Sequence, residues 1–143
     1  MKRIGLTLTA LAVTAVTAFA QGASNIRLNE VMTNNTRSIQ DEFGNNGPWV
    51  EIVNTAYSTY NIRGMYITTD PSVLDKTMSV PDRMKRMSVI PNGDARTQLS
   101  ARQHLVFYLN SNPAQGTLHL TTKVDTTKAV WIALYDANAV DII

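Results

Sequence analysis

Cysteine is absent from this 143-residue chain, and histidine occurs only twice, at His104 and His119. Without cysteine there is no disulfide and no thiol nucleophile, so the burial of apolar side chains has to stabilise the fold. Neither histidine lies near a nucleophile-elbow motif, and no histidine cluster has the spacing of zinc ligands. We therefore expect a protein that is not an enzyme and that holds no cofactor and no metal.

The two histidines are expected to be ordinary strand residues. His119 alternates with Leu118 and Leu120, which predicts that its side chain faces solvent while the leucines face the core. His104 comes just before the apolar run that starts at Leu105, and a structural role is expected there as well. A hydrolase that uses one of them is the alternative, and nothing near them in sequence supports it.

Long apolar runs are missing after the first twenty residues. Lys2 and Arg3 are followed by an apolar and small-residue stretch over 4–17, and Ala18-Phe19-Ala20 then forms an A-x-A cleavage site before Gln21. This pattern predicts a signal peptide over 1–20, cut between Ala20 and Gln21, although an N-terminal membrane anchor is the alternative. We expect an exported bacterial protein that is periplasmic, secreted or on the cell surface, with one domain over 21–143 and no membrane span in it.

A strong excess of charge of either sign is also missing. The chain has 13 Lys and Arg against 11 Asp and Glu, and Lys2 and Arg3 leave with the signal peptide, so the mature part has 11 of each. A neutral domain has no general attraction for nucleic acid, and none is expected as a partner. The one local basic cluster is Arg83, Lys85 and Arg86. It is expected to be a solvated loop, with a binding patch as the alternative.

The remaining sequence is rich in short strand patterns. The stretch Pro48–Asn54 is the clearest of them, with the turn residues Gly47-Pro48 at its start, and Ile26–Met32 precedes it along the chain. Trp49 and Val53 lie on one face and Val50 and Ile52 on the other, so this strand has to be covered on both sides. The pattern places it inside a sheet that packs on a second layer.

Further strands are predicted at 87–90, 105–109, 117–121 and 129–135, with Trp131 in the core beside Trp49. Gly64 interrupts the strand pattern of 60–69, which predicts a bulge. Residues 70–91 are expected to be a long loop that ends in the first of these strands, and Asp136–Ala139 is expected to turn the chain into a last strand at 140–143. Since no segment after residue 20 shows a helical period, the spacing predicts an all-β sandwich.

The order of several short motifs resembles the lamin tail domain family. The motifs are Asn29-Glu30-Val31-Met32, an acidic glycine-containing loop over 41–47, Trp49-Val50-Glu51-Ile52-Val53-Asn54, and 62–70 with Gly64 and Asp70. Pro48 and Met65 depart from the family's pattern, which has an acidic residue and an aromatic at these places. The resemblance implies an immunoglobulin-like β-sandwich of the lamin tail domain type, preceded here by the signal peptide. It implies structural roles for Asn29, Glu30, Trp49, Glu51, Asn54, Gly64 and Asp70.

The resemblance also implies a function. Domains of this type are interaction or targeting modules, so the chain is expected to bind an unknown protein or cell-surface partner without catalysing a reaction. The alternative is the extracytoplasmic N-terminal domain of a larger membrane protein. Some gamma subunits of sodium-pumping decarboxylases resemble such a domain followed by a membrane helix.

Two acidic features were considered as sites. Glu30 shares the phase of Ile26, Leu28 and Met32, so it is expected to point inward and to need a partner such as Arg63 or Arg102. An acid-base role is the alternative for it, but no second carboxylate is placed to complete one. The loop over 41–47 could offer oxygen atoms to calcium, but it lacks the spacing of a calcium loop.

The last four residues, Val140–Ile143, are still apolar. In the lamin tail pattern this position opens a longer strand, so the domain is expected to be truncated there. A short last strand would leave an open sheet edge with unpaired backbone groups, which favours self-association.

Overall fold

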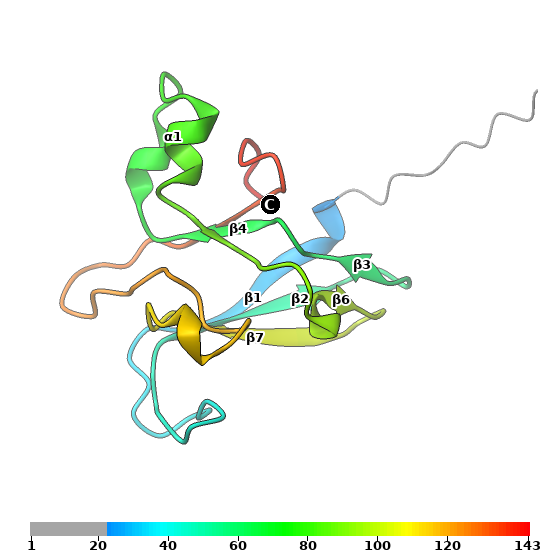
Figure 1. The fold of residues 1–143 in the computed structure, drawn as a ribbon, viewed down its shortest axis with the longest axis vertical. Coiled ribbons are helices and arrows are strands. Elements are labelled where there is room, and N and C mark those ends of the chain that lie inside the picture. Colours follow the sequence, from blue (N-terminus) through cyan, green and yellow to red (C-terminus); the bar gives the residue numbers. More distant parts are fainter. Residues whose placement is uncertain (1–22) are drawn as a thin grey trace, which may run out of the picture.

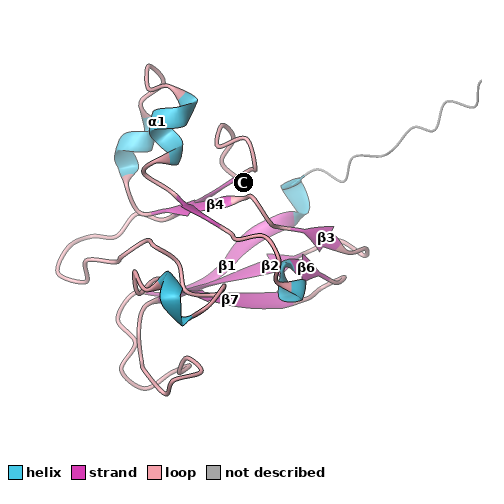
Figure 2. Cartoon of the chain, viewed as in Figure 1, coloured by secondary structure: helices cyan, strands magenta, loops and turns pink. Residues whose placement is uncertain are grey.

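The computed structural model describes residues 23–143, and the chain there is mainly β-structure in antiparallel sheets (Figures 1 and 2). The predicted signal peptide and its cleavage site at Ala20 and Gln21 lie outside the described residues. Among the described residues, no helix is long and apolar enough to cross a membrane. The expectation of an all-β chain is confirmed.

The largest sheet has the order β1-β2-β7, formed by β1 (Ile26–Met32), β2 (Trp49–Asn54) and β7 (His104–Tyr108). All of its pairings are antiparallel, with Trp49 opposite Met32 on one side and opposite Tyr108 on the other. These are the segments that the strand patterns predicted, shifted by one residue at β7. The central position of β2 explains its sequence, because both of its edges are paired and Val50 and Ile52 are fully buried.

Two smaller sheets complete the fold. One has the order β5-β4-β8, from β5 (Ser88–Val89), β4 (Tyr66–Thr68) and β8 (Ala133–Tyr135), and the other pairs β3 (Tyr60–Asn61) with β6 (Gln98–Leu99). Figure 1 shows β4 between α1 and the β1-β2-β7 sheet. The strand predicted at 87–90 is confirmed, since β5 lies within it.

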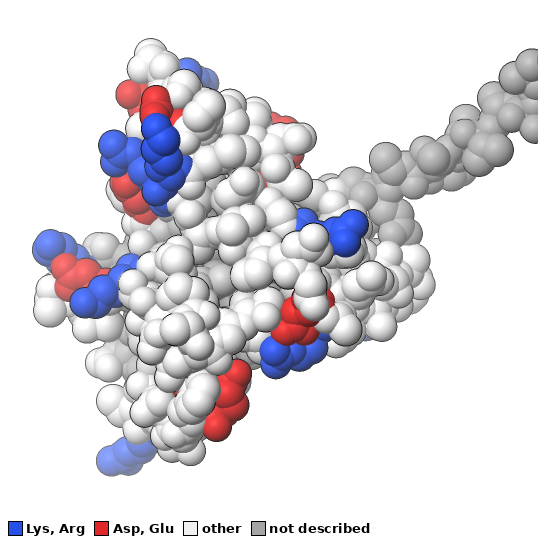
Figure 3. Space-filling model, viewed as in Figure 1, with Lys and Arg blue, Asp and Glu red and all other residues white. Residues whose placement is uncertain are grey.

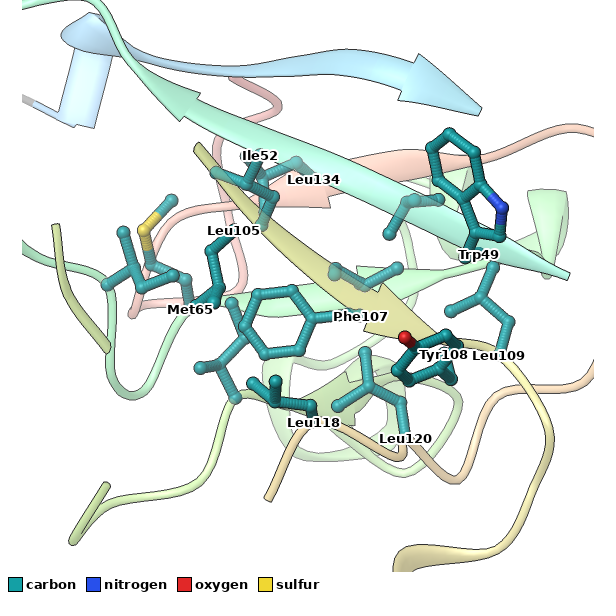
Figure 4. Close-up of a cluster of buried hydrophobic side chains, with 14 of the residues drawn as sticks. Trp49, Ile52, Met65, Leu105, Phe107, Tyr108, Leu109, Leu118, Leu120 and Leu134 are labelled. Atoms are coloured by element: carbon teal, nitrogen blue, oxygen red, sulfur yellow. The ribbon is translucent and has the colours of Figure 1, made fainter. Parts of the chain in front are cut away.

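The larger of two apolar clusters within residues 23–143 joins the two three-stranded sheets. Ile52 and Phe107 from the first sheet share it with Ile67 and Leu134 from the second, and all four are fully buried. Figure 4 shows Phe107 among the side chains of this cluster, below β7. Two sheets that cover one core have the general form of a β-sandwich.

The prediction of a bulge at Gly64 is wrong, because Gly64 lies in a tight turn between β3 and β4. The N–H of Met65 donates to the carbonyl of Ile62 over 3.2 Å, and Gly64 has a φ of +78°. A residue with a side chain is strained at that backbone angle, so glycine is suited to this turn. The sequence pattern was broken here because one strand ends and another begins.

The prediction of a long loop over 70–91 missed two short helices. They are the 3₁₀ helix η2 (Pro71–Leu74) and the α-helix α1 (Val80–Met84). Each starts at a capping residue followed by proline: Asp70 accepts from the N–H of Ser72, and Ser79 accepts from the N–H of Asp82. Helices this short show no apolar period, which is why the pattern missed them. Other short 3₁₀ helices are η1 (Ala23–Asn25), η3 (Ala95–Thr97) and η4 (Pro113–Gln115).

Three predicted strands are wrong or too long, and the last of them, predicted at 140–143, is reduced to a single bridge between Tyr135 and Ile142. Residues 117–121 form no strand, and they contact β7 only around Tyr108, whose backbone bonds to the carbonyl of Leu118 and the N–H of Leu120. The strand predicted at 129–135 shrinks to β8, which leaves Trp131 outside it and partly exposed. The turn after β8 is confirmed, since the N–H of Asp136 donates to the carbonyl of Asp141 over 3.0 Å.

Candidate functional site

A β-bulge in β1 sets the face on which its polar side chains lie. Leu28 pairs with Ile52 and the next paired residue, Glu30, lies opposite Glu51, so Asn29 is an extra residue in β1. One extra residue moves every later side chain to the other face of the sheet. The prediction that Glu30 points inward is therefore wrong: Glu30 is exposed and lies on the same face as Glu51.

Glu51 is the centre of a hydrogen-bonded group on this face. Its Oε1 accepts from Nδ2 of Asn29 over 2.6 Å and lies 2.8 Å from Nδ1 of His104. His104 is the diagonal neighbour of Glu51 on β7, because it lies directly opposite Val53. The bulge, β2 and β7 thus bring Asn29, Glu30, Glu51 and His104 together, and we call these four residues the polar sheet face.

The electrostatics of the polar sheet face are dominated by Glu51. Partial burial raises its pKa, but the hydrogen bonds from His104 and Asn29 outweigh this effect, so the pKa of Glu51 lies below its ordinary value of 4.5. Glu30 stands directly across from it in β1, which brings a second carboxylate onto the same face. The polar sheet face can therefore accept several hydrogen bonds from a ligand, and its acidic groups favour a basic or hydrogen-bond-donating one.

Asn54, at the end of β2, joins two loops. It is fully buried, and its Nδ2 donates to three backbone carbonyls, those of Ser58, Leu99 and Ser100, over 2.8 to 3.1 Å. Its Oδ1 accepts from the N–H of Ala56 over 3.0 Å. The family-motif asparagine thus holds the turn after β2 against the turn before β7. This is a structural role.

The two loops that Asn54 joins present an exposed pair of side chains. Tyr57 is 86% exposed, and the guanidinium carbon of Arg102 lies 4.5 Å from the centre of its ring. Arg102 has a φ of 62°, an uncommon backbone angle for a residue with a side chain. The two residues are far apart in sequence, so no local pattern could have predicted the contact.

The other motif residues hold the framework. Trp49 is buried to 3% exposure, and its Nε1 has no hydrogen-bond partner among the described residues. Asp70 caps η2 and lies 3.1 Å from a guanidinium nitrogen of Arg86. Hydrogen bonds from Ser72, then from Arg86, hold the pKa of Asp70 below its ordinary value. Gly64 forms the turn described above.

The basic cluster of Arg83, Lys85 and Arg86 lies on and just after α1. Arg83 donates to the carbonyl of Ala139 over 3.1 Å, and Lys85 pairs with Asp82 over 2.7 Å. Arg86 pairs with Asp70, as noted. Figure 3 likewise shows blue and red atoms adjoining in small separate groups over α1 and elsewhere on this side of the molecule. The three residues do not form one open positive patch.

His119 contradicts the expectation of a solvent-facing side chain, since it is only 1% exposed. Its ring stacks on Tyr108 with 5.0 Å between the ring centres, and Phe43 packs edge-on at 6.0 Å. The alternation around it belongs to no strand, because both leucines and His119 are buried in an irregular segment. A polar residue between leucines was the only sequence signal, and it was misleading.

The polar contacts of His119 fix its tautomer. Nδ2 of Asn110 lies 2.8 Å from Nδ1 of His119, and Oδ1 of the same amide accepts from the N–H of Asn112. The amide therefore donates to Nδ1, and the proton of the neutral imidazole lies on Nε2. Nε2 is 3.2 Å from Oε2 of Glu42, without the alignment of a hydrogen bond. This contact ties the loop before β2 to the segment after β7.

Within the loop over 41–47, the carboxylate of Asp41 organises its own backbone. Oδ1 accepts from the N–H groups of Phe43 and Asn45, over 2.9 and 2.8 Å. Burial raises the pKa of Asp41, but these bonds outweigh it and the pKa lies below the ordinary value. No group of three or more His, Cys, Asp or Glu in residues 23–143 is placed to hold a metal ion.

Comparisons with protein-family models, with curated proteins and with solved structures find no match to this chain. The polar sheet face is the place where most of the polar motif residues of β1 and β2 meet in solvent. It is the candidate functional site.

Proposed function

We propose that the chain is an exported, non-catalytic interaction module with an immunoglobulin-like sandwich of the lamin tail domain type. The polar sheet face is its binding surface, and the partner is a protein or a cell-surface component. The signal-peptide pattern over 1–20 supports export, and the motif order supports the family.

The observation that carries this proposal is that the motif residues fall into two groups, one with structural contacts and one on the polar sheet face. The first group consists of residues in turns, in a helix cap and in the core: Asn54, Gly64, Asp70 and Trp49. The second group lies on the polar sheet face and consists of Asn29, Glu30 and Glu51. Polar side chains that are held in place on a rigid sheet, and that are exposed to solvent, are suited to recognition.

Site-specific photocrosslinking in cells that export the full chain tests the proposal. A photoreactive residue in place of Glu30 is expected to form one defined covalent adduct. The same residue in place of Thr77, which is exposed in the loop between η2 and α1, should form none.

The mature N-terminus is checked in the same material by mass spectrometry, and it is expected at Gln21. Equal adducts from both positions, no adduct from Glu30, or a retained Met1 in the protein isolated from the cell envelope would count against the proposal.

A further inference from the structure

Two depressions adjoin just after β4, and they share Thr69. The first has a volume of about 290 Å³ and is lined by Arg86, Ser88 and Thr122 among others. The second has a volume of about 220 Å³ and includes Lys123 and Trp131 in its lining. We call the two together the Thr69 groove.

The fold holds both sides of the Thr69 groove in place through the end of β4. The hydroxyl of Thr68 donates to the carbonyl of Arg86 over 2.8 Å, and the hydroxyl of Thr69 donates to the carbonyl of Lys123 over 3.1 Å. These bonds tie the segment before β5 and the segment after residue 120 to the same strand end. The groove is therefore formed by anchored backbone and not by a free loop.

The lining of the Thr69 groove carries more positive than negative charge. It contains four basic residues and one acidic residue, namely Lys85, Arg86, Lys123, Lys128 and Asp125. Lys128 pairs with Asp125 over 3.1 Å, while Lys85 and Arg86 pair with carboxylates outside the lining. Within residues 23–143, no ion pair involves the ammonium group of Lys123. Since the mature part has equal numbers of both charges, this excess is local.

Hydroxyl groups form the floor of the first depression. The Ser88 hydroxyl lies 2.6 Å from that of Thr121 and 2.5 Å from that of Thr122. The Thr122 hydroxyl also donates to the carbonyl of Ile67 over 3.3 Å, so the protons of the three hydroxyls are used within the protein and their oxygens keep acceptor capacity for the hydroxyl groups of a ligand. The partly exposed indole of Trp131 adds an apolar wall to the second depression.

We propose that the Thr69 groove binds an acidic saccharide, one that carries carboxylate or sulfate groups on a chain of sugar rings. The lysines and Arg86 contact the acidic groups, the hydroxyl floor bonds to the sugar hydroxyls, and the indole packs on a ring face. A nucleic acid fits less well, because its affinity depends on many phosphate contacts and the positive excess here is small. The site is separate from the polar sheet face and goes beyond the function proposed above.

Binding of defined probes to the exported protein tests the assignment. The probes are oligogalacturonate for carboxylates, sulfated dextran fragments for sulfates, neutral dextran, and a single-stranded DNA oligonucleotide. Titration calorimetry gives the affinities, and tryptophan fluorescence gives a local signal. An acidic saccharide is expected to bind at least about tenfold more tightly than neutral dextran or DNA. Binding of the carboxylated probe or of the sulfated probe shows which acidic group the groove recognises.

Matched variants separate a site from general charge attraction. Lys123→Glu is expected to weaken binding at least about tenfold, and Lys76→Glu, the same charge change at an exposed position outside the groove, to change it less than about twofold. Trp131→Phe should abolish the fluorescence change while calorimetry still detects binding. The assignment would be overturned by equal losses of affinity in both lysine variants. It would also be overturned if DNA bound as tightly as the saccharide, or if neither acidic probe bound.

Discussion

His104 and Glu51 are diagonal neighbours across β7 and β2, with 2.8 Å between Nδ1 and Oε1, and the contact is completed by Asn29 from the bulge of β1. Three strands thus meet at one carboxylate, and β7 is distant in sequence from the other two. Because the hydrogen bonds favour the ionised form of Glu51, the group links the stability of the sheet to pH.

Glu51→Gln tests this link. A lowered pKa in the folded protein means that Glu51 adds stability above its ordinary pKa of 4.5, and that this stability is lost as the pH falls through the lowered value. We expect wild type to exceed Glu51→Gln by about 0.5–1 kcal/mol at pH 6, and the difference to vanish in strong acid. Urea titrations from pH 3 to pH 7 measure it.

Glu30→Gln is the control for this experiment. It removes a carboxylate directly opposite Glu51, so it relieves repulsion and should leave stability unchanged or slightly raised. A loss of stability in Glu30→Gln as large as that in Glu51→Gln would contradict the assignment of the favourable contacts to Glu51.

Asn54→Ala is expected to destabilise the protein by about 2–3 kcal/mol, because it removes the amide that donates to the buried carbonyl of Leu99 and joins the two loops. Asn138→Ala is the matched control. Asn138 is exposed and its amide donates to a carboxylate oxygen of Asp136, so its loss should change the free energy of unfolding by less than about 0.5 kcal/mol. Chemical denaturation measures both, and similar midpoints for the two variants would show that the buried amide is not holding the loops.

The two tryptophans are expected to differ. Trp49→Ala should cost about 3–5 kcal/mol, the range for a buried aromatic side chain, and Trp131→Ala less than about half of that because Trp131 is partly exposed. Trp49→Phe should destabilise the protein less than Trp49→Ala, since the ring is kept and the indole N–H of Trp49 has no hydrogen-bond partner among the described residues. Equal losses for the two alanine variants would place Trp131 in the core after all.

His119→Phe should loosen the loop before β2. The aromatic ring keeps its packing on Tyr108, but the contacts with Asn110 and Glu42 are lost. We expect faster hydrogen exchange at the amides of Phe43 and Asn45, and little change in the amides of β2. Uniform acceleration throughout the sheet would instead show that His119 stabilises the whole core.

The segment after the last turn bears on self-association. The carbonyl of Asp141 and the N–H of Ile143 bond to residues of β8 and its turn, so the backbone groups of Ile142 point the other way, and no hydrogen bond to them exists within residues 23–143. Val140 and Ile142 are 49% and 53% exposed. We expect light scattering of the 21–143 fragment at tens of micromolar to show oligomers.

Ile142→Lys should restore a monomer, because a charged side chain on an edge opposes pairing with another chain. Leu74→Lys, a similar change at an exposed leucine of η2, should leave the oligomers in place. A wild-type fragment that stays monomeric, or oligomers that survive in Ile142→Lys, would contradict pairing through this edge.

Sequence patterns were reliable where a strand is regular and buried. The stretch Pro48–Asn54 was predicted as a strand from its apolar residues, and β2 starts one residue later, at Trp49. The patterns failed where structure depends on contacts between distant segments. The bulge at Asn29 depends on pairing with β2, and the burial of His119 depends on Tyr108, Phe43 and Asn110. The short helices after Asp70 are fixed by caps that span only three residues.

The candidate site was predicted only in part. Asn29, Glu30 and Glu51 were identified through the motifs, but their common face was not, because a one-residue bulge reverses the direction of every later side chain. His104 was expected to be a structural residue and is instead part of the group. Nothing in the sequence around Lys123 or Trp131 indicates that both line one groove with Ser88.

The order β1-β2-β7 also determines how the chain can fold as it is synthesised. β1 and β2 are close in sequence and can pair early, but β7 ends at residue 108, so the second edge of β2 has no partner until most of the chain has emerged. During that interval Val50 and Ile52 lie on an uncovered hairpin. Folding that waits for a distant strand is slow and leaves apolar surface open to aggregation. A protein with this strand order benefits from a holding chaperone until β7 is available.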